Sequence, residues 1–436
     1  MKEISSTQGS ICVFACRWCS LLGAERAGRD HLALPAGIRL IPVSCAGSVS
    51  ADLVIQALTG GASGVAVLGC HLGGCRHNDA NRDAHARLEV LGELLDAVGL
   101  DRRRLLVSWG TAHEAEQYAR LMRDFASLLS SLPPLSVPDA ACNDTPVRKP
   151  LSGPFSEKTE DDALRAVAAE ALRGGKTVLA LRRTDMGIQP CLFRREEELA
   201  GLIAGPRWPL AKCAGLILKD RAAGTVQGME FRALREEAFS LDAGPLTVAC
   251  RECDADALRE LVSLRQFPGE LLSMLPVPCS QAMKAACACT REEADAARAD
   301  TAENGTVQER AEFWREEFSR CVQCHWCREA CPVCVCPSCS LDNAALTPLG
   351  PQASPMGYHL ARAMHVADAC VLCGACQEAC PRNLPLLRLH RAAARALGRR
   401  NYVSGRGELS PLRSERQRAA AQGSAIPQWK HNLGGK

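Results

Sequence analysis

The cysteines of this chain are numerous and grouped, and they constrain its structure more than any other feature. The chain has 25 cysteines among 436 residues, against 3 tyrosines and 9 phenylalanines. Six lie between Cys12 and Cys75, eight between Cys142 and Cys289, and eleven between Cys321 and Cys380. A chain of this length can bury several hydrophobic cores without disulfides, so cysteines at this density indicate bound metal.

The rest of the composition is that of an ordinary globular protein. Hydrophobic residues make up 47%, charged residues 23%, and the formal charge of +3 gives no argument for nucleic acid. Apolar runs such as 65–68 are far shorter than the roughly 20 residues of a membrane span. Residues 11–15 are too short for a secretory signal, and Arg17 interrupts them. We therefore expect a protein of the reducing cytoplasm, without a membrane span.

The first 130 residues alternate apolar strands with helical patterns. Strands are expected at 10–15, 38–44, 64–68 and 104–109, and helices at 51–58, 79–98 and 112–129. This alternation predicts a parallel sheet with helices on both faces, and the carboxyl ends of its strands meet at one edge. Five cysteines follow those ends and could supply the four thiolates of an iron–sulfur cluster: Cys16, Cys19, Cys45, Cys70 and Cys75. The alternative is that some of them are small buried apolar residues, the role expected for Cys12 inside the first strand.

Three stretches of this domain carry a family resemblance. They are Phe14-Ala-Cys-Arg-Trp-Cys-Ser20, Val43-Ser-Cys-Ala-Gly47 and Leu68-Gly-Cys-His-Leu-Gly-Gly-Cys-Arg-His-Asn78. Together they resemble the delta subunit of methyl-viologen-reducing hydrogenase, the MvhD family. The resemblance implies a 2Fe–2S cluster held by four of the five cysteines, without saying which one is spare. It also implies docking onto the flavin subunit of heterodisulfide reductase, HdrA, and electron delivery there for flavin-based bifurcation.

Two histidines flank the same cysteines. His71 and His77 could act as ligands of the Rieske type, but with five thiols available we expect them beside the ligands or at the surface.

Near the C-terminus the same cysteine motif occurs twice. Cys321-Val-Gln-Cys-His-Trp-Cys-Arg-Glu-Ala-Cys-Pro332 and Cys370-Val-Leu-Cys-Gly-Ala-Cys-Gln-Glu-Ala-Cys-Pro381 both follow the spacing of bacterial two-cluster ferredoxins. In that pattern the first three thiols of a motif hold one 4Fe–4S cluster and the fourth ligates the other cluster. The expected ligand sets are Cys321, Cys324, Cys327 and Cys380 for one cluster, and Cys370, Cys373, Cys376 and Cys331 for the other. Zinc is the weaker interpretation, because a zinc site uses four thiols in all.

Three further cysteines lie between the two motifs. Cys334, Cys336 and Cys339 are surplus to the pair of clusters and are candidates for a third, completed by a cysteine of the middle domain. Otherwise they bind zinc or are inert. A helix is expected at 357–367, with His359 and His365 beside the clusters or at the surface.

The middle of the chain is also α/β in pattern. Helices are expected at 162–172, 196–203 and 254–264, and strands at 176–181 and 246–249. The stretch 250–262, together with 313–318 and the run after Cys331, resembles the beta-subunit family of formate dehydrogenases and deazaflavin-reducing hydrogenases. Some members bind FAD, but the absence of a glycine-rich phosphate loop argues against it here. The cysteines of this region are either cluster ligands, or core residues and inert thiols: Cys250, Cys253, Cys279, Cys287 and Cys289.

Composition divides the chain into six segments. Residues 131–160 are rich in proline and serine and predict a linker, and 291–316 predict a solvated helix or a loose tether. From residue 391 onward ten lysines and arginines face two glutamates, which predicts a disordered or partner-docking basic tail rather than a nucleic-acid arm. The predicted fold class is therefore α/β, divided into an MvhD-like domain (1–130), a linker (131–160), an α/β middle domain (161–290), a connector (291–316), an α-rich two-cluster ferredoxin-like domain (317–390) and the tail (391–436).

No paired carboxylates, nucleophile–base set or P-loop is evident, so the sequence favours an electron-transfer subunit. We expect it to relay electrons between a hydrogenase or formate dehydrogenase and an HdrA-like flavoprotein, with fusion of the two modules fixing their distance. The alternatives are a flavin-containing oxidoreductase subunit that oxidises a small carrier such as a reduced deazaflavin, and a zinc-stabilised scaffold.

Overall fold

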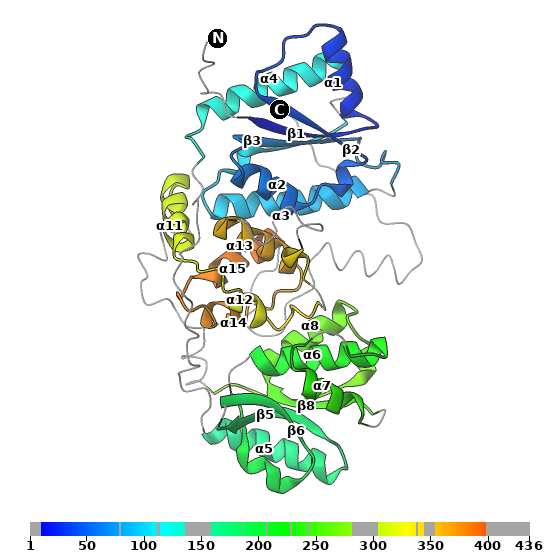
Figure 1. Cartoon of the computed structure of the whole chain (residues 1–436), viewed down its shortest axis with the longest axis vertical. Coiled ribbons are helices and arrows are strands. Elements are labelled where there is room, and N and C mark those ends of the chain that lie inside the picture. Colours follow the sequence, from blue (N-terminus) through cyan, green and yellow to red (C-terminus); the bar gives the residue numbers. More distant parts are fainter. Residues whose placement is uncertain are drawn as a thin grey trace.

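The computed structural model describes residues 10–77, 80–110, 114–135, 158–185, 187–205, 208–226, 229–241, 244–280, 304–336, 339–343 and 354–397. Most of the predicted linker and basic tail lies outside these residues. The described chain forms an N-terminal α/β part, a middle α/β part and a helical C-terminal part, as the predicted fold class requires. Their order in space differs from their order in the chain, because the C-terminal helices lie between the two α/β parts (Figure 1).

The N-terminal part is a four-stranded parallel sheet. Its strands are β1 (Ile11–Cys16), β2 (Ile38–Val43), β3 (Gly64–Gly69) and β4 (Leu105–Trp109), in the order β2-β1-β3-β4. All residues of β1 and β3 are buried, as continuous apolar runs at the centre of a covered parallel sheet should be. The four predicted strands are confirmed.

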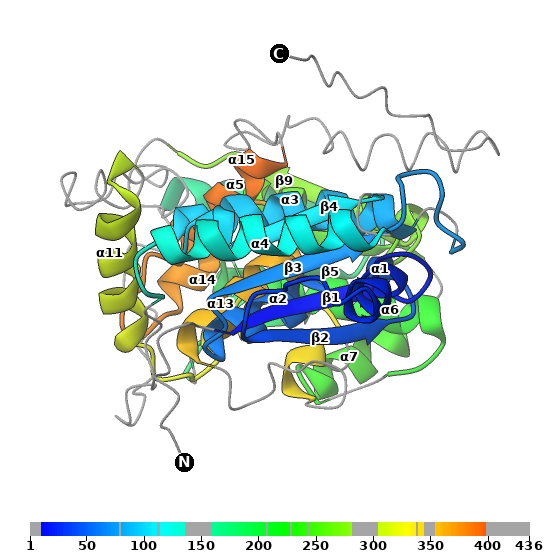
Figure 2. The same cartoon turned by 90° about the horizontal axis from the view of Figure 1, so that it is seen from above.

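Helices cover both faces of this sheet (Figures 1 and 2). On one face lie α1 (Ser20–Arg29) and α4 (Ala115–Ser131), and on the other α2 (Ala51–Thr59) and α3 (Ala80–Ala97). The sequence patterns missed α1. Its buried face consists of Ser20, Gly23, Ala24 and Ala27, so it carries almost no hydrophobic periodicity.

The middle part is a mixed sheet in the order β6-β5-β8-β9, with the short β7 (Leu202–Ile203) on β5. Strand β5 (Val178–Thr184) pairs antiparallel with β6 (Gly187–Phe193) and parallel with β8 (Leu246–Arg251), which pairs parallel with β9 (Leu272–Val277). Its helices are α5 (Lys158–Arg173), α6 (Trp208–Ala223), α7 (Arg232–Phe239) and α8 (Glu252–Ser263). The helix expected at 196–203 was wrong in form, because residues Glu196–Gly201 make a 3₁₀ helix that leads into β7.

The C-terminal part consists of α11 (Val307–Ser319), α12 (Trp326–Glu329), α13 (Pro355–Val366), α14 (Ala375–Glu378) and α15 (Leu386–Ala396). Helix α11 runs across the predicted boundary at residue 316 and buries Phe313, Trp314 and Phe318. These rings share one core with α2, α3, α13 and α15, so the C-terminal helices pack directly on the N-terminal α/β part.

A glycine permits the closest approach between these two parts. Gly99 has φ +74°, and a Cβ there would lie 2.2 Å from the backbone nitrogen of Ala311 in α11. Beside it, Arg310 Nε donates to the carbonyl of Asp96 over 2.8 Å. On the other side, Val335 and Val371 enter the core of the middle part. No helix in the described ranges is both long and apolar enough to span a membrane.

Candidate metal centres

Five thiols gather at the carboxyl edge of the N-terminal sheet. Cys16 ends β1, Cys70 follows β3, and Cys45 lies just beyond β2, so the parallel topology brings together residues that are far apart in sequence. The Sγ atoms of Cys16 and Cys70 are 3.8 Å apart, and those of Cys45 and Cys75 are 3.5 Å apart. Cys19, at the start of α1, instead directs its thiol to the carbonyl of Gly69 over 3.5 Å.

Backbone donors and one side chain shape this site. The amide of Gly47 donates to Cys45 Sγ over 3.2 Å, and that of His77 to Cys75 Sγ over 3.4 Å. Asn81 Nδ2 donates to the carbonyls of Cys70 and His71, both at 3.0 Å, and so holds the loop between β3 and α3. Amides that point at sulfur stabilise thiolates and thiolate-bound metal.

The two histidines flanking the site are exposed. The ring of His71 packs over Gly110, where a Cβ would lie 2.0 Å from Nδ1. Gly110 also has φ +82°. Both the close His71 ring and this left-handed backbone conformation therefore favour glycine there.

Burial disfavours ionised thiols at this edge. It is the main cause that raises the pKa of Cys19, Cys45 and Cys70, the last to about 12, with neighbouring thiolates adding to the effect. Thiolates this close to one another need a nearby cation, which is the situation that bound iron provides.

The two C-terminal motifs fold alike. Each has two residues with positive φ at matching positions, Gln323 and His325 in the first and Leu372 and Gly374 in the second, followed by the short helices α12 and α14. In each motif the two left-handed residues are separated by one residue. The amide of Gln323 donates to Cys321 Sγ over 3.4 Å. The repeat in sequence is therefore also a repeat in backbone conformation.

Each motif lends its fourth cysteine to the other. One small cavity is lined by Cys321, Cys324, Cys327 and Cys380, and a second by Cys331, Cys370, Cys373 and Cys376. Within each set, three thiols come from one motif and the fourth from its partner motif. Burial raises the pKa of Cys321 and Cys370 to about 12 and that of Cys327 to about 11. Four thiols that line one small cavity fit a 4Fe–4S cluster.

Helix α13 lies against both cavities. His359 Nε2 is 3.4 Å from Cys321 Sγ at the first. Arg362 lines the second and donates to the carbonyl of Cys327 over 3.0 Å. Neither Arg362 nor His390, whose Nε2 lies 2.9 Å from Arg362, was identified from the sequence. The available signal was a single arginine in the otherwise apolar middle of the 357–367 helix.

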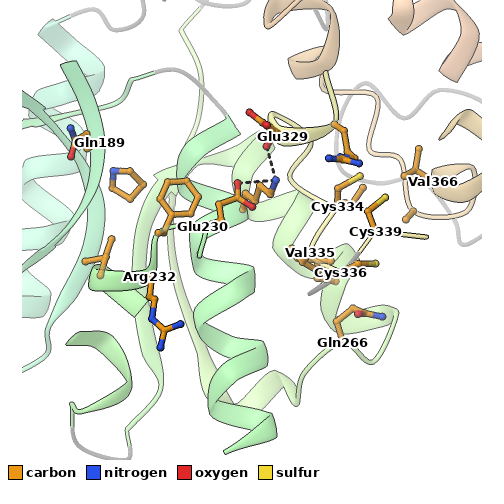
Figure 3. Close-up of a pocket in the computed structure, with 18 of the residues that line it drawn as sticks. Gln189, Glu230, Arg232, Gln266, Glu329, Cys334, Val335, Cys336, Cys339 and Val366 are labelled. Carbon is orange, nitrogen blue, oxygen red and sulfur yellow. Dashed lines mark hydrogen bonds and ion pairs between the residues drawn. The ribbon is translucent and has the colours of Figure 1, made fainter. Parts of the chain in front are cut away.

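The three surplus cysteines line a different and much larger cavity, between the middle and C-terminal parts. It has a volume of about 1670 Å³, and Cys334, Cys336 and Cys339 gather at one end while Gln189 lies at the other (Figure 3). The buried ammonium of Lys212 sits in its wall, 2.9 Å from Glu230 and 2.8 Å from the carbonyl of Glu329. Cys334 also donates a hydrogen bond that, as the main cause, lowers the pKa of Cys331.

The middle-part cysteines are placed elsewhere. Cys250 is buried in the core at the end of β8, and neither it nor Cys253 nor Cys279 lines the large cavity. Cys287 and Cys289 lie outside the described residues. Within those residues, no group of three or more Cys, His, Asp or Glu side chains is arranged to hold a single metal ion.

Known proteins resemble separate parts of this chain. Residues 11–132 match the family described as methyl-viologen-reducing hydrogenase, delta subunit, and residues 364–384 match a 4Fe-4S binding domain. The D-type iron-sulfur subunit of the F420-non-reducing hydrogenase of Archaeoglobus profundus is 34% identical over 124 residues, which are 28% of this chain and 90% of that protein. The chain belongs to this delta subunit family. It carries the family's domain at its N-terminus and extends well beyond it.

Two other relatives are larger proteins matched in part. The HdrA-type subunit of the ferredoxin/F420H2-dependent CoB-CoM heterodisulfide reductase of Methanosarcina acetivorans is 35% identical over 125 residues, 29% of this chain. The beta subunit of the F420-dependent formate dehydrogenase of Methanocaldococcus jannaschii is 33% identical over 104 residues, 23% of this chain. The chain spans 16% of the length of the first and 27% of the second.

Proposed function

We propose that this protein is an iron–sulfur electron-transfer subunit, which relays electrons between a hydrogenase or formate dehydrogenase and an HdrA-like flavoprotein in a bifurcating complex of the reducing cytoplasm. The observation that carries the proposal is the presence of three cysteine groups in one packed unit: five thiols at a sheet edge and two crossed sets of four. Iron–sulfur clusters in these sets would supply reversible one-electron transfer.

The role of the protein itself in this proposal is to fix the positions of the groups. The core shared by α2, α3, α13 and α15 holds the N-terminal part against the C-terminal part. His365 Nε2 on α13 adds a contact of 2.9 Å to Asp52 on α2. A fixed separation between redox groups removes the cost of a diffusional encounter between them. The predicted division into domains is part of this proposal, with the whole of α11 counted to the C-terminal part.

Metal, sulfide and flavin analysis of anaerobically purified protein tests the proposal, together with EPR spectra of the reduced state. We expect about ten irons per chain, from one 2Fe–2S and two 4Fe–4S clusters, and no flavin. About fourteen irons would add a third 4Fe–4S cluster at Cys334, Cys336 and Cys339. Zinc in place of iron would exclude an electron-transfer role.

One observation favours a second candidate function, a flavin-containing oxidoreductase subunit that oxidises a small reduced carrier such as a deazaflavin. The cavity of about 1670 Å³ is larger than the usual small-molecule site, and its wall carries three cations, of which Lys212 and Arg232 are paired with Glu230 and Glu236 and Arg183 is exposed to solvent. It also shares Val333, Arg362 and Val366 with the second four-thiol cavity. Stoichiometric FAD in the same analysis would decide for this function.

The proposed HdrA-like partner has a candidate docking surface beside the five thiols. Five of the exposed large apolar side chains fall between residues 18 and 41: Trp18, Leu22, Leu34, Leu40 and Ile41. Within the described residues β2 is an edge strand of its sheet, and the guanidinium of Arg76 stacks 4.4 Å over Trp18. In the two heterodisulfide reductase A subunits, the segment that matches this chain is part of the A subunit itself. This supports an HdrA-like flavoprotein as the partner that binds this surface.

We expect Leu40→Asp combined with Ile41→Asp to weaken binding of the flavoprotein at least tenfold, about 1.4 kcal/mol, because it places charge on both faces of the edge strand β2, whose successive side chains alternate between faces. Binding is measured by anaerobic titration of the purified partner. Met229→Asp is the matched control, since Met229 is likewise an exposed apolar side chain, on the middle part. Equal affinities of the double variant and the wild type would exclude this surface.

A further inference from the structure

Three side chains on one face of α13 reach three different sites. His359, Arg362 and His365 are spaced three residues apart, which places them along the same side of the helix. His359 contacts Cys321 at the first four-thiol cavity, and His365 contacts Asp52 in the N-terminal part. Arg362 lies between them, at the boundary of the two cavities.

Among the described residues, the guanidinium of Arg362 is buried without an acidic partner. Its residue is 2% exposed. One terminal nitrogen donates to the carbonyl of Cys327 over 3.0 Å, and the other lies 2.9 Å from His390 Nε2. Its Nε has no hydrogen-bond partner, and within the described residues no carboxylate forms an ion pair with it. A buried charge of this kind is costly unless something nearby compensates it.

The nearby negative charges are thiolates. Arg362 lines the cavity that holds Cys331 and Cys376, shares the wall of the large cavity with Cys334, and donates to the carbonyl of Cys327. The two cavities differ in how they lie relative to Arg362. Arg362 and His390 line the second cavity and not the first, which Arg362 meets only through Cys327. The arginine that does line the first cavity, Arg382, is partly exposed and hence screened by solvent.

We propose that Arg362 is the fixed counter-charge of the cluster held by Cys331, Cys370, Cys373 and Cys376, and that it raises the reduction potential of this cluster above that of its neighbour. The inference rests on the proposed function. A reduced cluster carries one more negative charge than the oxidised cluster, so a buried cation at its edge stabilises the reduced state. No proton accompanies this charge, since an arginine stays protonated throughout. The electron then rests preferentially on the cluster that adjoins the large cavity.

The test is an EPR-monitored redox titration of the full chain with Arg362→Gln. The reduction equilibrium of the second cluster is expected to shift at least tenfold toward the oxidised state, which is about 59 mV for one electron. The first cluster should shift less. Its signal is identified by its absence in the Cys380→Ser variant. Iron and sulfide content are measured on the same samples.

Two further variants separate charge from packing. Arg362→Lys retains the positive charge and should restore most of the wild-type potential. Arg310→Gln removes an arginine that joins α11 to the carbonyl of Asp96, away from both cavities, and should leave both potentials unchanged. If Arg362→Gln does not assemble its clusters, the lysine variant decides, because a loaded lysine variant without the potential difference overturns the proposal.

Full clusters with unchanged potentials in Arg362→Gln overturn the counter-charge, and equal shifts of both clusters overturn its assignment to the second. Failure of the proposed function is distinct from either outcome. It would appear as the absence of 4Fe–4S signals in the wild type itself.

Discussion

Replacing Cys380 with serine is expected to abolish the cluster held by Cys321, Cys324 and Cys327, although Cys380 belongs to the other motif. Cys380 lines the same small cavity as those three thiols. Serine is a poor ligand for iron in this setting, so the variant should lose about four of its roughly ten irons and one 4Fe–4S EPR signal. The cluster of Cys370, Cys373 and Cys376 should remain, because its fourth thiol is Cys331.

Pairs of substitutions make the crossing measurable by iron counts alone. Cys324→Ser with Cys380→Ser should lose the same four irons, approximately, as either change alone, because both remove one cluster. Cys373→Ser with Cys380→Ser should lose about eight, because two clusters are affected. If each motif instead kept its own four cysteines, these two results would be exchanged.

A matched control comes from the middle part of the chain. Cys191 lies in β6 and is a half-buried thiol that lines neither four-thiol cavity, so Cys191→Ser should retain all iron. The 2Fe–2S signal serves as an internal reference in every variant, since its proposed ligands lie at the N-terminal sheet and the varied cysteines lie in other parts of the chain. Loss of that signal along with the others would indicate general unfolding and not the loss of a ligand.

Sequence patterns located the strands of the N-terminal part because those strands are uninterrupted apolar runs. The patterns missed α1 because its buried face consists of small residues, and they missed α6 because it is apolar on nearly all sides. Helix α6 is buried on nearly all sides between Leu210 and Leu218, so no polar face reveals its period. They missed β6 because Pro190 interrupts it, which is tolerated since β6 is an edge strand. Each failure reflects a tertiary environment that the local sequence does not record.

Some of the candidate sites could likewise be predicted from local sequence, and others could not. The crossed sets could be proposed from motif spacing, because three ligands of each set are local in sequence. The large cavity and the counter-charge could not. The cavity joins Gln189 and Glu230 to Cys334 and Asp368, segments that meet only in the folded chain. The sequence shows Arg362 in an apolar helix, but it does not show that, among the described residues, its buried charge has no carboxylate partner.

The N-terminal site also goes beyond what spacing could predict, because the structure divides its five thiols unequally. A tetrahedral metal with metal–sulfur bonds of about 2.3 Å separates two of its thiolates by about 3.8 Å. The Sγ separations of 3.8 Å for Cys16 and Cys70 and 3.5 Å for Cys45 and Cys75 are close to this value. We propose that each pair holds one iron of the 2Fe–2S cluster, and that Cys19 is the spare cysteine.

Cys19→Ser is accordingly expected to retain the 2Fe–2S cluster, while serine at any of the four paired positions removes it and about two irons. The serine hydroxyl can take over the hydrogen bond that the Cys19 thiol donates to the carbonyl of Gly69 at the end of β3, so the start of α1 should keep its place. The measurement is iron and sulfide content with EPR of the reduced protein, made on all five single variants under identical anaerobic conditions. Cys19 also interacts with Cys70, which makes it the natural competitor of Cys16 for the first iron. A cluster that survives Cys16→Ser but not Cys19→Ser would therefore exchange these two assignments and leave the second pair, Cys45 and Cys75, as proposed.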